Sequence, residues 1–188
     1  MRSAWMLLVG VAVATTATDA SAHPLDMGYL RVDSQATTTI MLDLHVDAAA
    51  SLVARSALDA EAVRSGSLEL ANATYRRVPI ATEAGPCEWT STTAELRGRS
   101  VIQTGHARCP ASAQTLRWEL PFVTRLPSTF QLLAKARIAE IEHVTTLGRT
   151  TTTLEASGTT AAPAIGFAHF VWSGVEHIGA APGERRGP

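Results

Sequence analysis

Apolar and polar residues alternate through most of the chain between residues 28 and 155. In 38–46, every second residue from Ile40 to Val46 is apolar, as in a strand with one buried face. Gly, Pro and Asn separate further segments of the same type at 28–32, 74–81, 88–96, 101–108, 115–121, 130–138 and 142–153. This spacing predicts an all-β fold, an antiparallel β-sandwich.

The phase of the alternation also predicts the core of the sandwich. Trp118 alternates in phase with Leu116 and Leu120, so these three side chains should share one buried face. The expected core residues are Leu42, Leu44, Trp118, Leu120 and Leu132.

One segment, 47–63, interrupts the strand pattern. It is rich in alanine and leucine and begins at Asp47, a residue type that caps helices. We therefore expect one short helix within 47–64, across an open end of the sandwich. Arginine and aspartate break its apolar stripe, so a loop with a single helical turn is the alternative.

Residues 1–22 have the three parts of a secretory signal peptide. Arg2 gives a positive start, 5–13 is an apolar run, and 19–22 ends in the small residues that signal peptidases cleave. Because the apolar run is too short to span a bilayer, cleavage is expected rather than an uncleaved membrane anchor. The sequence thus predicts an exported protein whose mature chain begins at His23.

Cys87 and Cys109 are the only cysteines. An even pair in an exported chain favours a disulfide, which predicts Cα atoms within about 7 Å of each other on neighbouring strands or on a strand and its adjoining loop. A thiolate metal site is the alternative, because His106 lies close before Cys109.

The amino-acid composition changes after residue 156. A linker of small residues, 157–163, leads into an apolar segment at 164–181, which is long enough to enter a membrane, and a polar tail follows at 182–188. We expect 164–181 to be a helix separate from the sandwich.

At helical spacing, His169 and Glu176 share one face of this segment, and His177 lies at the edge of that face. Ionisable residues within an apolar helix often mark an ion pathway, and imidazole with carboxylate suits a divalent transition metal. A helix lying at the membrane interface, with these groups among the headgroups, is the alternative.

The run GFAHFVWSGVEHI at 166–178 resembles the start of the first transmembrane helix in HupE/UreJ-like membrane proteins, in the branch with a large extracytoplasmic N-terminal domain. The mature start His23-Pro24-Leu25 is similar to that branch as well. The resemblance implies a role in handling or transporting nickel or cobalt. The family continues with an aspartate–histidine motif and several more membrane helices that this sequence lacks, so the resemblance implies a truncated member or an N-terminal part with its own role.

His23 is a second candidate metal ligand. After cleavage, its α-amino group and ring Nδ1 can chelate one metal, and a further histidine would complete a copper-type site. His45, His106 and His143 lie on predicted strands and are the available partners. The alternative function is therefore a soluble periplasmic copper- or nickel-binding protein.

Other classes of function find little support in the sequence. The net charge is −1 and the basic residues are scattered, so nucleic acid is not an expected partner. The motifs G-x-S-x-G, H-E-x-x-H, the P-loop and G-x-G-x-x-G are all missing, and we expect no catalysis. The leading expectation is a non-catalytic periplasmic domain at 23–156, tethered to the inner membrane by 164–181, where its partners would be the membrane and the other helices of a membrane module.

Overall fold

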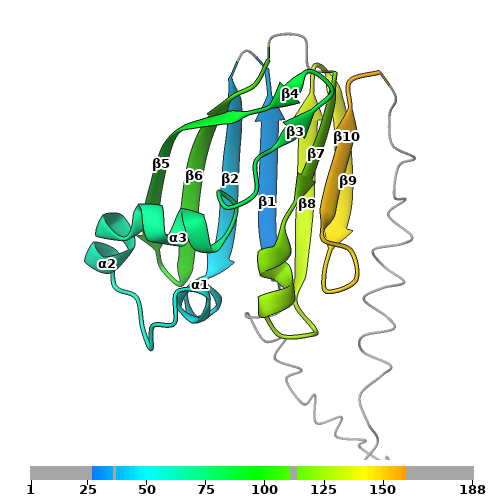
Figure 1. The fold of residues 1–188 in the computed structure, drawn as a ribbon. Coiled ribbons are helices and arrows are strands. Elements are labelled where there is room, and N and C mark those ends of the chain that lie inside the picture. The colour runs from blue at the N-terminus through cyan, green and yellow to red at the C-terminus, as the bar shows by residue number, and fades with distance from the viewer. Residues whose placement is uncertain (1–26, 36, 111–113, 160–188) are drawn as a thin grey trace, which may run out of the picture.

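The structure is a computed structural model, and it describes residues 27–35, 37–110 and 114–159. Within these ranges the strands form a six-stranded sheet and a four-stranded sheet. Three short α-helices and one 3₁₀ helix complete the fold (Figure 1). The predicted signal peptide, residue 23 and the predicted helix 164–181 lie outside the described residues.

The larger sheet has the strand order β5-β6-β2-β1-β8-β9. Its strands are β1 (Met27–Ser34), β2 (Thr38–His45), β5 (Glu88–Arg97), β6 (Ser100–Arg108), β8 (Gln131–Ile138) and β9 (Ile141–Leu147). The prediction of a purely antiparallel fold is wrong at one central pair, because β1 and β8 run parallel. Parallel neighbours need a long connection, and residues 35–130, which include β2, link β1 to β8.

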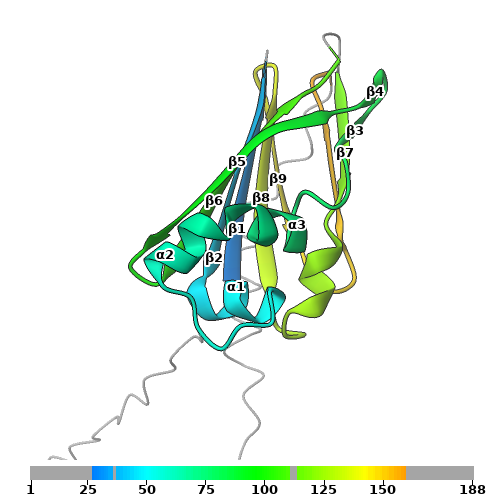
Figure 2. The same cartoon turned by 60° about the vertical axis from the view of Figure 1, so that its left-hand side comes forward.

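The smaller sheet has the order β10-β7-β3-β4, and all its pairs are antiparallel. Its strands are β3 (Ala81–Thr82), β4 (Gly85–Pro86), β7 (Thr115–Glu119) and β10 (Thr153–Ser157). The two sheets form separate layers, as Figure 2 shows. The mostly β fold with two sheets is therefore as predicted.

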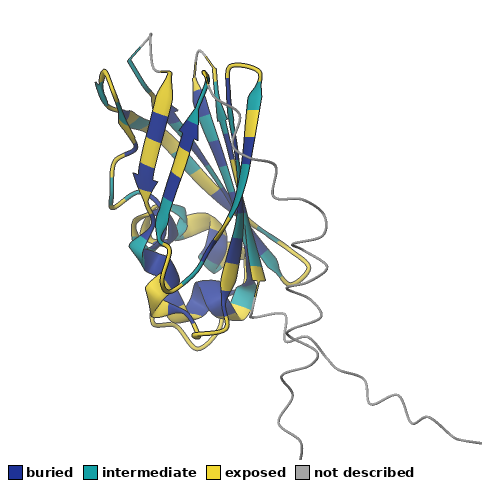
Figure 3. Cartoon of the chain, turned by 90° about the vertical axis from the view of Figure 1, so that its right-hand side faces the viewer, coloured by how far each residue is buried: buried dark blue, intermediate teal, exposed yellow. Residues whose placement is uncertain are grey.

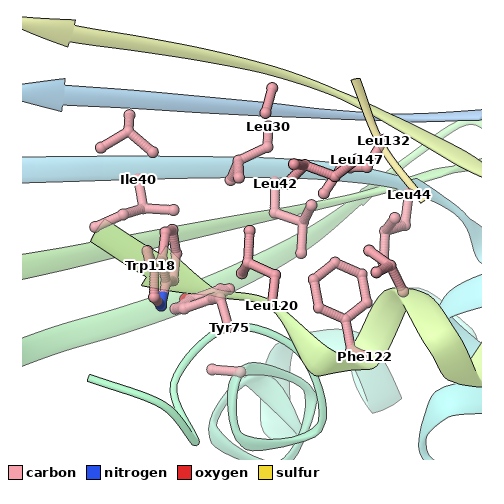
Figure 4. Close-up of a cluster of buried hydrophobic side chains, with 14 of the residues drawn as sticks. Leu30, Ile40, Leu42, Leu44, Tyr75, Trp118, Leu120, Phe122, Leu132 and Leu147 are labelled. Atoms are coloured by element: carbon pink, nitrogen blue, oxygen red, sulfur yellow. The ribbon is translucent and has the colours of Figure 1, made fainter. Parts of the chain in front are cut away.

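One hydrophobic core lies between the layers and includes buried side chains from both sheets. The five predicted core residues are fully buried: Leu42, Leu44, Trp118, Leu120 and Leu132 (Figure 4). Leu116 is buried together with Trp118 and Leu120, which confirms the predicted phase. Buried and exposed residues alternate along the strands in Figure 3, as expected when one face of each sheet covers a core.

Two predicted strands need correction. Segment 74–81 contains strand structure only at its last residue, where β3 begins. Its apolar character comes instead from a connection whose Tyr75 and Ile80 are buried in the core. Segment 142–153 is two strands, β9 and β10, because Gly148 and Thr151 exchange backbone hydrogen bonds and turn the chain between them.

The prediction of a single helix within 47–64 is wrong, because the region forms α1 (Val46–Leu52) and α2 (Ala60–Ser65), and α3 (Ser67–Ala73) follows. The first cap is His45 rather than Asp47, since His45 Nδ1 accepts a hydrogen bond from the Asp47 backbone N–H. Ala54 (φ 55°) has a left-handed conformation just after α1 and ends that helix. Asp59 caps α2 by accepting a hydrogen bond from the Ala62 backbone N–H.

The predicted disulfide between Cys87 and Cys109 is confirmed, with a Cα–Cα distance of 4.2 Å. Cys87 immediately precedes β5 and Cys109 immediately follows β6, and these two strands pair directly. Both cysteines are therefore engaged in the bridge, which excludes the alternative of a thiolate metal site.

The domain has two chemically different ends (Figure 1). The helix end consists of α1, α2, α3 and the 3₁₀ helix η1 (Pro121–Arg125), and β1 begins there. The turn end carries the turn residues 34–35, 37, 83–84 and 139–140 and the end of β10 (Figure 1). The disulfide lies at this end too, because it joins the residue before β5 to the residue after β6. No helix in the described ranges has the length and apolar character needed to cross a membrane.

Candidate functional site

The predicted metal ligands His23, His169, Glu176 and His177 all lie outside the described residues, so their role stays a prediction. The three strand histidines proposed as partners of His23 are described. They are His45 at the end of β2, His106 on β6 and His143 on β9.

His143 has a structural role. Its ring is buried, and Nε2 lies 2.6 Å from the Ser157 carbonyl oxygen and 3.1 Å from the Ser157 backbone nitrogen. These contacts join β9 of the larger sheet to β10 of the smaller sheet. His143 is therefore a buried, hydrogen-bonded histidine that links the two sheets.

His45 and His106 lie too far apart to share a metal. Thr39 is opposite His106 in the sheet, and six residues of an extended strand, about 20 Å, separate Thr39 from His45. His106 Nδ1 lies 3.4 Å from Thr39 Oγ1. Among the described residues, no three His, Cys, Asp or Glu side chains come close enough together to hold a metal ion.

A buried cluster of aromatic and polar side chains fills the core beneath α3. The ring centroids of Tyr75 and Trp89 are 5.2 Å apart, and that of Trp118 lies 5.9 Å from Trp89. Tyr75 packs directly on β6 at Gly105, where an added Cβ would come within 2.9 Å of the tyrosine ring. Gln103 lies one step away on the same face of β6, and its Oε1 accepts a hydrogen bond from Thr74 Oγ1 (3.0 Å).

This aromatic cluster has little capacity for catalysis. Tyr75 Oη, Trp89 Nε1 and Gln103 Nε2 are buried without a hydrogen-bond partner among the described residues. Burial raises the pKa of Tyr75, so its phenol stays neutral at physiological pH. The cluster combines neutral groups and no acid–base pair, which makes packing its main role.

The sequence prediction did not find this cluster. Gln103 falls in a strand that was placed correctly, and its in-phase neighbours Val101 and Ala107 are buried. That alternation was the available signal that Gln103 faces inward. Tyr75 was assigned to a strand that does not exist, so its position over Gly105 could not be anticipated.

An open hollow of about 490 Å³ lies at the side of the domain, where β10 and β7 approach β9. Its walls carry Glu83, Arg117, His143 and Glu155. His143 is occupied by Ser157, and Arg117 pairs with Glu155 (3.6 Å). The remaining polar side chain of note is Glu83.

Glu83 fastens the β3–β4 turn to the start of β7. Its carboxylate accepts hydrogen bonds from the backbone N–H groups of Gln114 and Thr115 and from Thr115 Oγ1 (2.5 Å). The Thr115 hydroxyl, followed by the Gln114 N–H, lowers the pKa of Glu83 from 4.5 to about 2. The side chain is thus a structural anion rather than a free ligand.

Low pH should weaken the hydrogen bonds that the Glu83 carboxylate accepts from the start of β7. Because the pKa of Glu83 is lower in the folded state, its contribution to stability is complete above pH 4.5 and is lost as the pH falls through about 2. We expect Glu83→Gln to lower the free energy of unfolding near neutral pH, and the difference from wild type to vanish at the acid limit. Urea denaturation at several pH values across this range measures the difference in the free energy of unfolding between the variant and the wild type. Glu140→Gln, in an exposed turn, is the control, and a pH-independent effect of Glu83→Gln would contradict the assignment.

A charged cluster occupies the outer face of the larger sheet. Arg137 donates hydrogen bonds to both carboxylate oxygens of Asp33 (3.2 and 2.5 Å), and Arg31 lies 3.6 Å from the same carboxylate. The Arg137 hydrogen bonds lower the pKa of Asp33. Both arginines are engaged with the Asp33 carboxylate, which balances one of their two positive charges.

The helix end carries a groove of about 740 Å³ between α1, α3 and η1. Arg125 donates hydrogen bonds to the carbonyl oxygens of Leu52 (2.6 Å) and Ala73 (3.4 Å), at the carboxyl ends of α1 and α3. Leu68 is 50% exposed beside the groove, and Arg77 makes no ion pair with any described residue. The groove thus places the exposed Leu68 near Arg77, an exposed arginine that forms no ion pair within the described part of the chain.

No family model matches the chain, and no curated protein matches it either.

Proposed function

We propose that this chain is a non-catalytic extracytoplasmic domain, tethered to the inner membrane by residues 164–181 and belonging to, or derived from, a HupE/UreJ-like metal-handling protein. The observation that carries the proposal is the apolar run 166–178 with His169 and Glu176 on one face. A divalent ion such as nickel or cobalt would be cargo, handled at the membrane face by His169, Glu176 and His177.

Two features of the folded domain support this reading. The Cys87–Cys109 disulfide suits an oxidising compartment such as the periplasm. The described residues enclose one hydrophobic core, as expected for a two-layer β-sandwich that folds outside the membrane. The domain would then present surfaces to partners, while the apolar segment provides the attachment.

Cell fractionation tests the tether. We expect the wild-type chain in the membrane pellet after an alkaline wash, because 164–181 is long and apolar enough to insert. Val171→Arg, near the middle of this segment, should move the chain to the soluble periplasmic extract, since arginine at the centre of a span costs about 2.5–3.5 kcal/mol. Thr159→Arg, placed before the apolar run, is the matched control and should leave the chain in the pellet.

Recovery of the wild-type chain in the soluble extract would contradict the tether. It would favour the alternative function, a soluble metal-binding protein that uses the mature His23. That alternative predicts copper or nickel binding by the processed chain, measured by titration calorimetry, and loss of this binding in His23→Ala.

A further inference from the structure

The described chain ends at the turn end of the domain. Gly158 follows β10, and its backbone N–H donates to the Gln114 carbonyl oxygen (2.7 Å) at the start of β7. An added Cβ at Gly158 would lie 3.2 Å from the Ile138 side chain, at the end of β8. The position of Gly158 is therefore fixed beside the 139–140 turn, away from α1 and α2 (Figure 1).

The segment between Gly158 and the apolar run is short compared with the domain. Ala164 follows Gly158 by six residues, which reach at most about 22 Å when fully extended. β5 alone has 10 residues, or about 33 Å along the long axis of the larger sheet. A span that begins at Ala164 therefore lies within reach of the turn end and out of reach of the helix end.

The described turns at the turn end carry mostly polar and charged side chains, as expected of a surface in contact with water rather than with hydrocarbon. Its described turns contain serine, glutamine, threonine and alanine, with Glu83 and Glu140 as their charged residues. The described turn residues at 34–35, 37, 83–84 and 139–140 include no basic side chain, whereas the exposed Arg108 lies at this end, at the last position of β6 and opposite Glu88 in the sheet. Because this end also carries Glu83, Glu88 and Glu140, it should attract anionic headgroups only weakly. The exposed large hydrophobic residues of the described chain, Met27 (63%) and Leu68 (50%), lie at the opposite end.

We propose, on the basis of the membrane tether argued above, that the domain stands on the lipid surface with its turn end next to the headgroups and its helix end away from them. The tether holds the turn end at the bilayer, without insertion and with little electrostatic attraction. This orientation presents the groove between α1, α3 and η1, with Leu68 and Arg77, to the aqueous compartment.

The test measures the distance of each end from the bilayer in the full-length chain. Glu140→Cys labels the turn end, and Ser56→Cys labels the exposed loop between α1 and α2 at the helix end. Each variant carries one fluorophore, since both native cysteines are in the disulfide. The chains are reconstituted into phosphatidylethanolamine–phosphatidylglycerol vesicles that contain a headgroup-linked energy acceptor, and vesicle flotation is recorded on the same samples.

We expect energy transfer to be several-fold stronger from residue 140 than from residue 56. Equal transfer, or stronger transfer from residue 56, in chains that float with the vesicles would overturn the orientation and leave the tether intact. Failure of the chains to float would overturn the proposed tether, and the orientation with it. Near-ultraviolet circular dichroism of both labelled variants verifies that the domain is folded.

Proteolysis within 160–163 provides a second measurement. The released domain should leave the vesicles at physiological salt, because the described turns at this end carry no large apolar and no basic anchor. Retention of the cleaved domain on the vesicles would contradict an attachment through the tether alone.

Discussion

Replacing Trp118 with alanine should lower the free energy of unfolding by about 3–5 kcal/mol, the range for truncating a fully buried large aromatic residue. Trp118 is fully buried between the two sheets, and its Nε1–H donates to the Val78 carbonyl oxygen (3.0 Å). The alanine variant loses the apolar contacts and the hydrogen bond together. Urea denaturation, followed by circular dichroism, measures the change.

Two phenylalanine variants separate the contributions of packing and hydrogen bonding. Trp118→Phe leaves the Val78 carbonyl without its donor, which should add about 1–3 kcal/mol to the packing loss. Trp89 belongs to the same aromatic cluster, but its buried Nε1–H has no partner among the described residues. Trp89→Phe removes that unpaired donor and should therefore cost clearly less. Equal losses in the two variants would show that the Val78 hydrogen bond contributes nothing measurable.

Removing the disulfide with Cys87→Ala and Cys109→Ala together should lower the free energy of unfolding by about 3 kcal/mol. The bridge closes a loop with a sequence separation of 22 and restricts the unfolded chain. Both cysteines flank the β5–β6 pair, so the folded strands keep their hydrogen bonds after the substitution. Chemical denaturation of the wild type and the double variant gives the difference.

A reducing agent provides the control for this effect. It should lower the denaturation midpoint of the wild type to that of the double variant and leave the double variant unchanged. A reduced wild-type protein as stable as the oxidised one would mean that the β5–β6 hairpin already keeps the two ends together in the unfolded state.

The features that could be predicted from the sequence are those with local causes. Alternation placed Leu42, Leu44 and Trp118 in the core, because every second residue of a strand points to one face. The two cysteines were paired because no other cysteine is available. Both features follow from neighbouring residues in a strand or from the number of cysteines in the chain.

The features that could not be predicted depend on contacts between distant segments. The parallel pairing of β1 with β8 leaves no trace in either strand, since both alternate as antiparallel strands do. Tyr75 is buried in a connecting segment because Gly105, far along the chain, leaves room for its ring. The helical region was divided incorrectly because the cap at His45 begins α1 earlier than Asp47 would.

The residues of the candidate site also differ in how far the sequence alone could reveal their roles. His143 could be identified as a candidate from its residue type, but only the fold shows that Ser157 of another sheet occupies its Nε2. Arg125 and Glu83 were not singled out because arginine and glutamate are common on surfaces. Their roles depend on carbonyl and N–H groups that folding brings next to them.

The parallel β1–β8 pair also limits when the larger sheet can be completed during folding. Asp33 on β1 and Arg137 on β8 are 104 residues apart, so β1 lacks one of its two neighbours until nearly the whole domain is present. Contacts of such high sequence separation slow folding, because the intervening chain must first lose its freedom. During synthesis from the N-terminus, β1 is made early and β8 late. The larger sheet can therefore be completed only after residue 138 has been made, and until then β1 has β2 as its one available neighbour.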